Sequence, residues 1–391
     1  MTDSALAGEL RRLREHRGLS YRRLAALAAC SSSQISDLEK GNRRPTREIV
    51  AALDRALGAQ GRLVAALRPL TPDDVEGELD AIELAQRAAA TDVSDSTLDR
   101  LERVADAMAM SYATTSPAEL LLRARRHLRY VDQLLDGRST LRQHRRLLVA
   151  GGWLVLLRAT LHVDLRQSAA AAAHLDTAAA LAEQAEHPEL AAWCLETQAW
   201  DALTRGAYGQ AVDLSRRAQA IAPAQGSAIV QATAQEGRAW ARIGDRAATG
   251  DSLTRVERMA EHRPEPEHPE HHFQYDPRKA HSYAATTLAW VGDPGAEQVA
   301  RDVIAELEAE GARPRRIASA RLDLGLALLA GDAPRPEEAS EEARAAIRSG
   351  RIVPSNWWRV MEVVSGVEES RAPDGRDLRD ETEAARPLSD S

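Results

Sequence analysis

The chain has 391 residues, which is enough for two or three domains and a large buried core. Its two cysteines, Cys30 and Cys194, are far apart in sequence, which argues against a disulfide framework or a thiolate metal site. Residues 1–70 contain 13 Lys or Arg and 7 Asp or Glu, a net charge of +6, whereas the whole chain carries −8. A basic head on an acidic body predicts that the head contacts a polyanion.

Alanine and leucine supply most of the apolar residues, and aromatic residues make up only 4% of the chain. This composition predicts an all-α fold class. The N-terminus lacks the apolar core of a signal peptide, and we find no apolar run of the roughly 18 residues that a membrane helix needs. We therefore expect a soluble, cytoplasmic protein with no membrane partner.

Five short helices are predicted in residues 1–70. Expected N-cap residues precede three of them, at Ser20, Ser31 and Thr46, and glycines are placed to end helices at Gly18, Gly41 and Gly58. The fifth helix is expected at about 62–68. The apolar positions that we expect to face the core are Leu6, Leu10, Leu13, Leu24, Leu27, Ile35, Leu38, Ile49, Leu53 and Leu57.

The third of these helices has the character of a DNA-reading helix. If Ile35 and Leu38 face the core, short polar side chains face outward at its N-terminus, where they suit base edges in a major groove. Basic residues follow the helix, where a phosphate backbone would pass, and the free N–H groups of its first turn suit a phosphate. The expected DNA-binding residues are Tyr21, Arg22, Ser31, Ser32, Ser33, Gln34, Asp37, Lys40, Arg43 and Arg44.

Three stretches, GLSYRRLAALA, SSSQISDLEKGNRRPT and IVAALDRALG, resemble the Cro/repressor-type (Xre-type) helix-turn-helix family over residues 5–68. The resemblance implies that Ser32, Ser33 and Asp37 face bases and that Ser31, Tyr21 and Lys40 face phosphates. It also implies that Glu39 is a structural partner within the domain. The family turn usually carries Gly where this chain has Ala29, and a positive φ there would cost about 1 kcal/mol.

The acidic body shows a helical repeat. Four glycines, Gly206, Gly244, Gly292 and Gly331, end predicted helices at intervals that become regular once an inserted loop at 262–272 is removed. The clearest unit, Trp193 to Pro223, resembles a tetratricopeptide repeat; HEAT-like pairing is the alternative. We expect a helix-turn-helix domain over 1–70, a helical connector over 71–140, a TPR-like α-solenoid over 141–365 and a disordered tail over 366–391.

A helical-repeat solenoid has a concave surface that commonly binds peptides or other ligands. The repeat pattern places seven residues on the first helix of each pair, where they would line that surface: Trp153, Trp193, Glu196, Trp200, Gln231, Arg238 and Lys279. The alternative is that the tryptophans only pack between repeats. The histidines of HPEHH match no zinc motif and are expected in a solvated loop. We find no catalytic constellation, and we expect no metal, no cofactor and no enzyme activity.

The stretches LRQHRRLLVAGGWL, HPEHHFQYDP and YAATTLAWVGDP resemble a set of actinobacterial Xre-type regulators, and the architecture is also similar to peptide-pheromone-responsive regulators. The resemblance implies a nucleoid-associated transcriptional regulator that binds double-stranded DNA. We expect a homodimer held by the acidic body, which senses a peptide, a small molecule or a protein partner. The alternative is a protein–protein interaction scaffold with secondary DNA contact.

Overall fold

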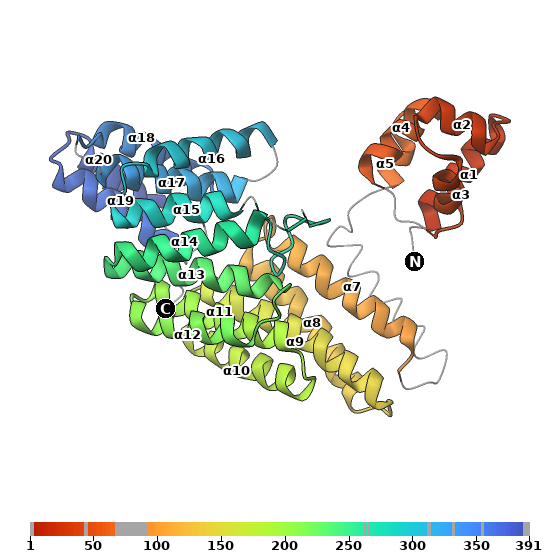
Figure 1. Cartoon of the computed structure of the whole chain (residues 1–391), viewed down its shortest axis with the longest axis horizontal. Helices are drawn as coiled ribbons and strands as arrows, with labels where there is room; N and C mark the ends of the chain where they lie inside the picture. Colours follow the sequence, from red (N-terminus) through yellow and green to blue (C-terminus); the bar gives the residue numbers. More distant parts are fainter. Residues whose placement is uncertain are drawn as a thin grey trace. The chain divides into compact units, whose positions relative to one another are not determined.

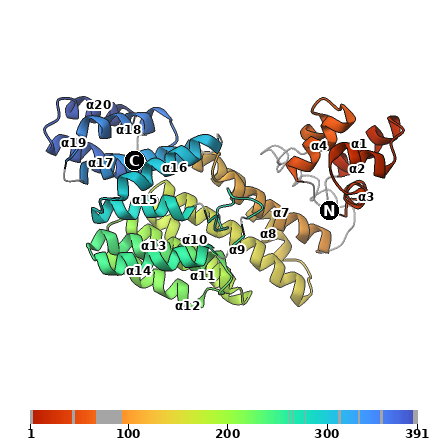
Figure 2. The same ribbon diagram turned by 45° about the horizontal axis from the view of Figure 1, so that its top comes forward.

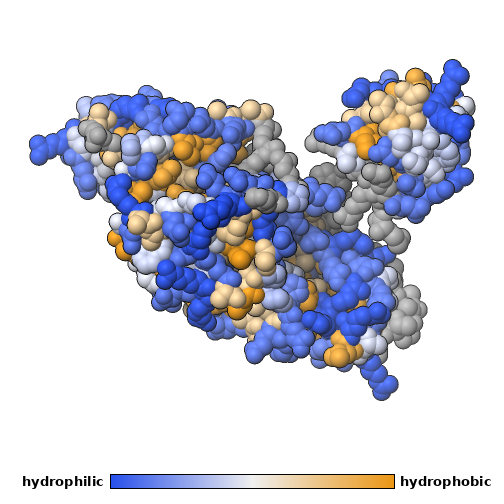
Figure 3. Space-filling view, viewed as in Figure 1, coloured by the Kyte–Doolittle hydropathy of each residue, from blue (hydrophilic) through white to orange (hydrophobic). Residues whose placement is uncertain are grey.

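The structure is a computed structural model in which residues 4–42, 46–66, 93–261, 263–264, 266–277, 279–310, 314–330, 333–352 and 356–385 are described. These residues form helices and connecting segments without a strand, so the fold class is all-α. The chain divides into two compact units, Met1–Gly77 and Glu78–Ser391. Both units present a largely hydrophilic surface in the view of Figure 3, with apolar side chains confined to patches.

The first unit contains five helices around one core, at the red end of the chain in Figure 1. The expected caps are present: Ser20, Ser31 and Thr46 each accept a hydrogen bond from a first-turn backbone N–H. Gly18, Gly41 and Gly58 have positive φ, as expected of residues that end helices. The helices are α1 (Ser4–His16), α2 (Tyr21–Ala28), α3 (Ser32–Glu39), α4 (Arg47–Leu57) and α5 (Arg62–Ala66).

Most of the expected core positions of the first unit are buried, with two differences. Leu27 is 58% exposed, because the buried face of α2 is formed by Leu24, Ala25 and Ala28. In α4, Val50 rather than Ile49 is fully buried. In each case the buried stripe lies about one residue away from the predicted position. Such an error is common for short amphipathic helices, because only a few turns define the stripe.

The second unit consists of helices stacked in consecutive pairs, and the pairs lie side by side in both ribbon views (Figure 1, Figure 2). This is the helical-repeat architecture that the sequence predicts. Its helices are α7 (Asp95–Ser111), α8 (Pro117–Leu135), α9 (Leu141–Asp164), α10 (Ser168–Gln184), α11 (Pro188–Thr204), α12 (Tyr208–Ile221), α13 (Ser227–Ile243), α14 (Arg246–Glu261), α15 (Lys279–Val291), α16 (Ala296–Glu310), α17 (Pro314–Ala330), α18 (Pro336–Arg348), α19 (Trp357–Glu369) and α20 (Gly375–Ala385).

Small residues let the helices of the second unit approach closely. A Cβ added at Gly152 of α9 would lie 2.5 Å from Leu190 of α11, and one at Gly237 of α13 would lie 2.9 Å from Ser252 of α14. Buried alanines serve the same purpose in most of the helices. The alanine-rich composition therefore belongs to the packing of the repeats.

Helix α9 is long and apolar enough to cross a membrane by length and composition, with a mean hydropathy of 1.4 over its most apolar 18 residues. It was the only such helix found among the described residues. The expectation that no run reaches this length is therefore wrong. Its apolar window is 78% buried, because α9 contacts α7, α8, α10 and α11. A helix that is apolar on all sides is expected when neighbours cover it all round.

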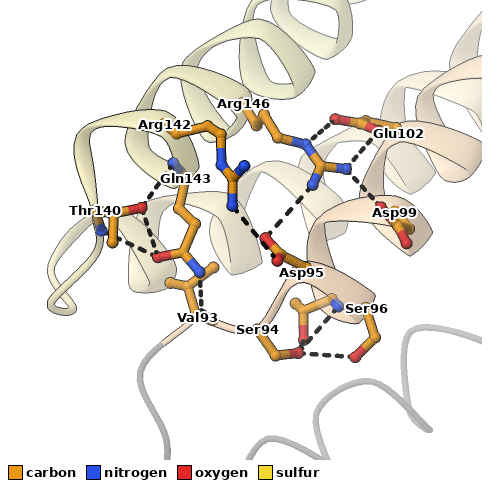
Figure 4. Close-up of polar contacts among 11 residues, drawn as sticks. Val93, Ser94, Asp95, Ser96, Asp99, Glu102, Thr140, Arg142, Gln143 and Arg146 are labelled. Carbon is orange, nitrogen blue, oxygen red and sulfur yellow. Dashed lines mark hydrogen bonds and ion pairs between the residues drawn. The ribbon is translucent and has the colours of Figure 1, made fainter.

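The stretch expected to be a connector belongs, from Val93 onward, to the second unit. Arg146 of α9 pairs with Asp99 at 2.6 Å and with Glu102 at 2.8 Å on α7 (Figure 4). The side chain of Gln143 donates a hydrogen bond to the Val93 carbonyl at 3.1 Å. Helices α7 and α8 also pack on α9. The start of α7 is thus fixed to the repeat unit by charge pairs and by a side-chain bond.

The C-terminal residues differ from the expected disordered tail. Helix α19 continues to Glu369, and α20 spans Gly375–Ala385. Leu378 of α20 is fully buried in the core shared with α17, α18 and α19. Arg344 of α18 pairs with Asp374 at 2.8 Å and with Glu381 at 3.0 Å. Arg379 of α20 also pairs with Glu368 of α19, so a buried leucine and charge pairs to two helices dock this polar helix. Residues 386–391 lie outside the described residues.

Candidate functional site

Helices α2 and α3 and the turn between them form the helix-turn-helix of the first unit. Ala29 has a φ of 51° and a ψ of 42°, so an alanine occupies the left-handed conformation for which glycine is favoured. Ile35 and Leu38 are buried, which turns the opposite face of α3 outward. On that face Ser33 is exposed, and Ser32, Gln34 and Asp37 are half-buried.

The first turn of α3 is held by a capping box. The Ser31 hydroxyl accepts from the Gln34 backbone N–H at 3.1 Å, and the Gln34 side-chain oxygen accepts from the Ser31 N–H at 2.9 Å. The hydroxyls of Ser31 and Ser33 also lie 2.9 Å apart. Gln34 therefore uses its carbonyl oxygen within the helix and keeps only its NH₂ group for another partner. The sequence predicted that Ser31 caps α3, but it did not predict that the Gln34 side chain completes the capping box.

Tyr21 and Glu39 form a structural contact beside the expected DNA face. The Tyr21 hydroxyl donates to Glu39 at 3.0 Å, and Arg14 donates to both carboxylate oxygens of Glu39 at 2.6 and 2.8 Å. The Arg14 guanidinium also lies 4.4 Å from the centre of the Tyr21 ring. Glu39 raises the pKa of Arg14 through these bonds. Since the single hydroxyl proton of Tyr21 is committed to Glu39, a hydrogen bond donated to phosphate would require this bond to break.

The basic residues expected to meet phosphate are described only in part. Arg22, on the first turn of α2, and Lys40, which ends α3, are both exposed. Arg43 and Arg44 lie outside the described residues. Of these four basic residues, the two described ones thus lie on either side of α3 in the sequence: Arg22 on the preceding helix α2, and Lys40 at the C-terminal end of α3.

The second unit contains a pocket of about 260 Å³. The pocket-lining residues on its helices come from the first helix of each pair, as the repeat pattern predicts for the inner surface. They are Asp164 on α9; Trp193, Glu196, Thr197 and Trp200 on α11; Gln231, Gln235 and Arg238 on α13; Ser282, Tyr283 and Thr286 on α15; Pro314, Arg315, Arg316, Ser319, Ala320 and Asp323 on α17; and Arg359 on α19. The other lining residues are Tyr112, Ala113, Thr114, Glu270, His272 and Asn356.

Five of the seven residues expected on the inner surface lie in this pocket: Trp193, Glu196, Trp200, Gln231 and Arg238. Trp153 does not; its ring packs on Phe273, with a centroid distance of 4.9 Å, and on His187. Lys279 is the first residue of α15, and its side chain lies outside the described part of the structure. Trp193 both lines the pocket and packs within the unit, because its ring lies 5.5 Å from that of Phe273 and its indole N–H donates to Glu189.

Arginines on the later helices of the unit are paired with buried carboxylates at the pocket. Arg315 pairs with Asp164 at 3.2 Å, Arg316 with Asp276 at 3.0 Å, and Arg359 with Asp323 at 3.2 Å. Arg315 also donates to the Tyr112 carbonyl at 2.6 Å. These contacts join α17 to segments 36 to 203 residues away in the sequence. Sequence reasoning missed all three arginines, although continuing the first-helix pattern into the last two repeats points to Asp323 and Arg359.

Arg238 is a different case. It is 4% exposed, and among the described residues no carboxylate lies within ion-pairing distance of it. Its guanidinium donates to Gln235 at 3.1 Å and lies 5.4 Å from the ring centre of Tyr283 and 5.1 Å from that of Trp290. Burial and the nearby Arg359 lower the pKa of Arg238 to about 10, while the nearby Asp323 and Glu196 act in the opposite direction, so Arg238 remains charged at neutral pH.

The segment 266–277 forms one wall of the pocket and is not the solvated loop that its histidines suggested. His271, Phe273, Tyr275 and Asp276 are buried. The His272 ring lies 4.1 Å from that of Tyr112, and its backbone N–H donates to the Ala109 carbonyl at 3.2 Å. The segment packs because its aromatic residues fill the space between α7 and α11. The prolines and glutamates of this stretch favoured the prediction of a solvated loop instead.

Comparison with known proteins identifies the first unit. Residues 5–67 match the family model described as a helix-turn-helix domain, which confirms the predicted domain type. Among solved structures, one similar chain is PlcR of Bacillus thuringiensis, determined in complex with the peptide PapR7 and DNA. It shares 14% sequence identity and a TM-score of 0.26, over 66% of this chain and 95% of that chain. No curated protein matches.

Proposed function

We propose that this protein is a sequence-specific DNA-binding transcriptional regulator whose helical-repeat unit binds an effector. The observation that carries the proposal is the helix-turn-helix at residues 5–67, with α3 presenting polar side chains outward and Lys40 exposed at its end. The excess of positive charge over residues 1–70 supports a polyanionic partner. This function places the protein in the cytoplasm with the chromosome.

The reading helix offers Ser32, Ser33, Gln34 and Asp37 to the bases. Serine and aspartate give weaker discrimination than the bidentate contacts of arginine, asparagine or glutamine, and the carbonyl of Gln34 is already used in the capping box. We therefore propose that two copies act together, on half-sites about 34 Å apart or a multiple of that distance. The acidic second unit, which is unsuited to lie on DNA, is the proposed dimer contact.

We assign effector binding to the pocket of the second unit. Its walls combine aromatic rings with buried charges, which is typical of ligand sites, and residues from α9 to α19 meet there. An effector that prefers one arrangement of these helices would shift DNA binding only by its difference in affinity for the two arrangements. Neighbouring repeats contact one another, so small rotations would accumulate along the array.

The test is selection of sheared genomic DNA by the purified full-length chain, followed by sequencing and by gel shift on the enriched fragments. We expect a common sequence element with two related half-sites. Footprinting of the enriched fragments and light scattering of the complex then give the stoichiometry. No enrichment above a shuffled-sequence control would contradict DNA binding and favour an interaction scaffold, whereas tight binding of a monomer to one half-site would contradict the dimer.

A further inference from the structure

We propose that the pocket of the second unit binds a small aromatic carboxylate, whose charged group pairs with Arg238 and whose ring lies among Trp193, Trp200 and Tyr283. This inference rests on the proposed function of the pocket as the effector site. It adds the chemical class of the ligand.

The first step is the charge of Arg238. A buried guanidinium without a directly paired carboxylate is costly, because the loss of its hydration is offset only in part. The neighbouring arginines of the pocket, such as Arg315 and Arg359, each pair with a carboxylate at 3.2 Å. Arg238 has no such pair among the described residues, although its guanidinium lines the pocket. Asp323 and Glu196 are near enough to act on its charge but do not pair with it, so an anion bound in the pocket would supply the direct partner that Arg238 lacks.

The second step is the set of hydrogen-bond donors that remain. Three buried N–H groups of pocket residues have no hydrogen-bond partner within the described parts of the chain: Nε of Arg238, Nε2 of Gln235 and Nε of Arg359. All three are donors in the usual protonation states, so the group that satisfies them must be an acceptor. A carboxylate offers two oxygens with about four acceptor sites, and its pairing with a guanidinium is among the strong charge-assisted hydrogen bonds.

The third step is the size and lining of the remaining space. The volume of about 260 Å³ lies below the range of roughly 300–1,000 Å³ that is usual for sites of drug-sized ligands. This favours a ligand of one or two rings over an extended peptide. Trp200 and Tyr283 supply ring surfaces at the pocket, on which a planar group can pack.

Arg238 therefore meets the ligand as a charged donor held at fixed position. Its neighbours fix it from both sides: Gln235 accepts one of its N–H groups, and the rings of Tyr283 and Trp290 lie within 5.4 Å and 5.1 Å of its guanidinium carbon. A side chain held in this way loses little conformational freedom when a ligand binds. The site is thus arranged for an anion before the anion arrives.

The experiment is calorimetric titration of the full-length chain with indole-3-acetate and phenylacetate, each compared with its neutral amide, and with inorganic phosphate. We expect at least one carboxylate to bind at least about tenfold more tightly than its amide, which has the same shape without the charge. Phosphate alone is expected to bind more weakly than that carboxylate, because it lacks the ring. Saturable binding of phosphate with no carboxylate binding would overturn the ring portion of the proposal.

Variants locate the contact. Arg238→Gln is expected to weaken carboxylate binding at least about tenfold and to leave the amide unchanged. The control is Arg242→Gln, one turn further along α13; Arg242 meets the same Trp290 ring at 5.2 Å but does not line the pocket. If Arg238→Gln fails to fold, Gln235→Met removes one of the free donors and is expected to weaken the carboxylate several-fold while the amide stays the same.

Three results would overturn the inference: no saturable carboxylate binding at millimolar concentrations, equal affinity for carboxylate and amide, or unchanged affinity in a folded Arg238→Gln chain. Gel shift on selected DNA separates this inference from the proposed function. Carboxylate binding by a chain that selects no DNA would contradict the regulator and leave the ligand class standing. Selective DNA binding without carboxylate binding would do the reverse.

Discussion

Arg315 lies 3.2 Å from Asp164, although the two residues are 151 positions apart in the sequence. The pair connects the start of α17 to the end of α9, and Asp164 is 1% exposed. It joins two first helices of separate repeats across the pocket, so it holds together parts of the solenoid that do not stack directly on each other.

Asp164→Asn is accordingly expected to lower the free energy of unfolding of the second unit by about 2–4 kcal/mol, since it leaves Arg315 without its buried partner. Partial exposure of Arg315, 19% for its side chain, keeps the loss toward the lower end. Denaturant unfolding measures the change. Asp176→Asn, at an exposed position of α10, is the control and should have little effect. Equal loss in both variants would show that the pair contributes nothing specific.

Lys40→Ala and Ser33→Ala are expected to change DNA binding in different ways. Loss of a phosphate contact by Lys40 should weaken binding to all sequences alike and flatten the plot of log affinity against log salt by about one. Ser33→Ala should change the preferred base at one position and leave that slope unchanged. Binding to a set of single-base operator variants at several salt concentrations measures both. Arg43→Ala is expected to behave like Lys40→Ala, and a change of base preference there would contradict the docking.

Ala29→Gly is expected to stabilise the first unit by up to about 1 kcal/mol, because glycine adopts the left-handed conformation of this turn without strain. Hydrogen exchange of the amides in residues 4–42 measures local stability in the full-length chain. Ala26→Gly, at an exposed interior position of the same helix α2, should have the opposite effect and destabilise by about 0.5–1 kcal/mol. Unchanged or faster exchange in Ala29→Gly would show that the turn at Ala29 is not strained.

Glu236 makes the stability of the second unit depend on pH in the acidic range. Burial alone would raise its pKa, but hydrogen bonds from Gln219, Arg255 and Arg216 outweigh burial and hold the pKa at about 2. A pKa below the unfolded value stabilises the folded state above pH 4.5, and this contribution is lost as the pH falls from about 4.5 toward about 2.

Glu236→Gln should therefore cost on the order of 2 kcal/mol at pH 7 and remove most of the loss of stability between pH 4.5 and pH 2. Urea unfolding at a series of pH values measures this. Glu257→Gln, at an exposed position of α14, should leave the pH profile unchanged. An unaltered acid limb in Glu236→Gln would show that other carboxylates dominate it.

The sequence predicted features that depend on neighbouring residues. The caps at Ser20, Ser31 and Thr46 follow from one hydroxyl and a first-turn N–H, and the αL conformation of Ala29 follows from the turn. The repeat period likewise predicted that the first helix of each pair lines the inner surface. Five of the residues expected there do line one pocket. The binding roles assigned to these residues remain predictions.

Features that depend on distant residues were missed. The segment around Phe273 packs against Trp153 and Trp193, which lie 120 and 80 positions earlier in the sequence, and no local pattern reveals that contact. The docking of α20 depends on the space that the core leaves for Leu378. Arg315 and Arg359 were missed for the same reason, since exposed and buried arginines look alike until their partners are known.

Helix α13 presents Gln231, Gln235 and Arg238 to the pocket at intervals of four and three residues, while Gly237 packs on Ser252 of α14. Recognition and assembly thus use different stripes of one helix. The specificity of this pocket can therefore be re-engineered at three positions of α13 without disturbing the contact at Gly237. Libraries restricted to such pocket-facing positions, one stripe for each first helix, would yield sensors for other molecules on an unchanged scaffold.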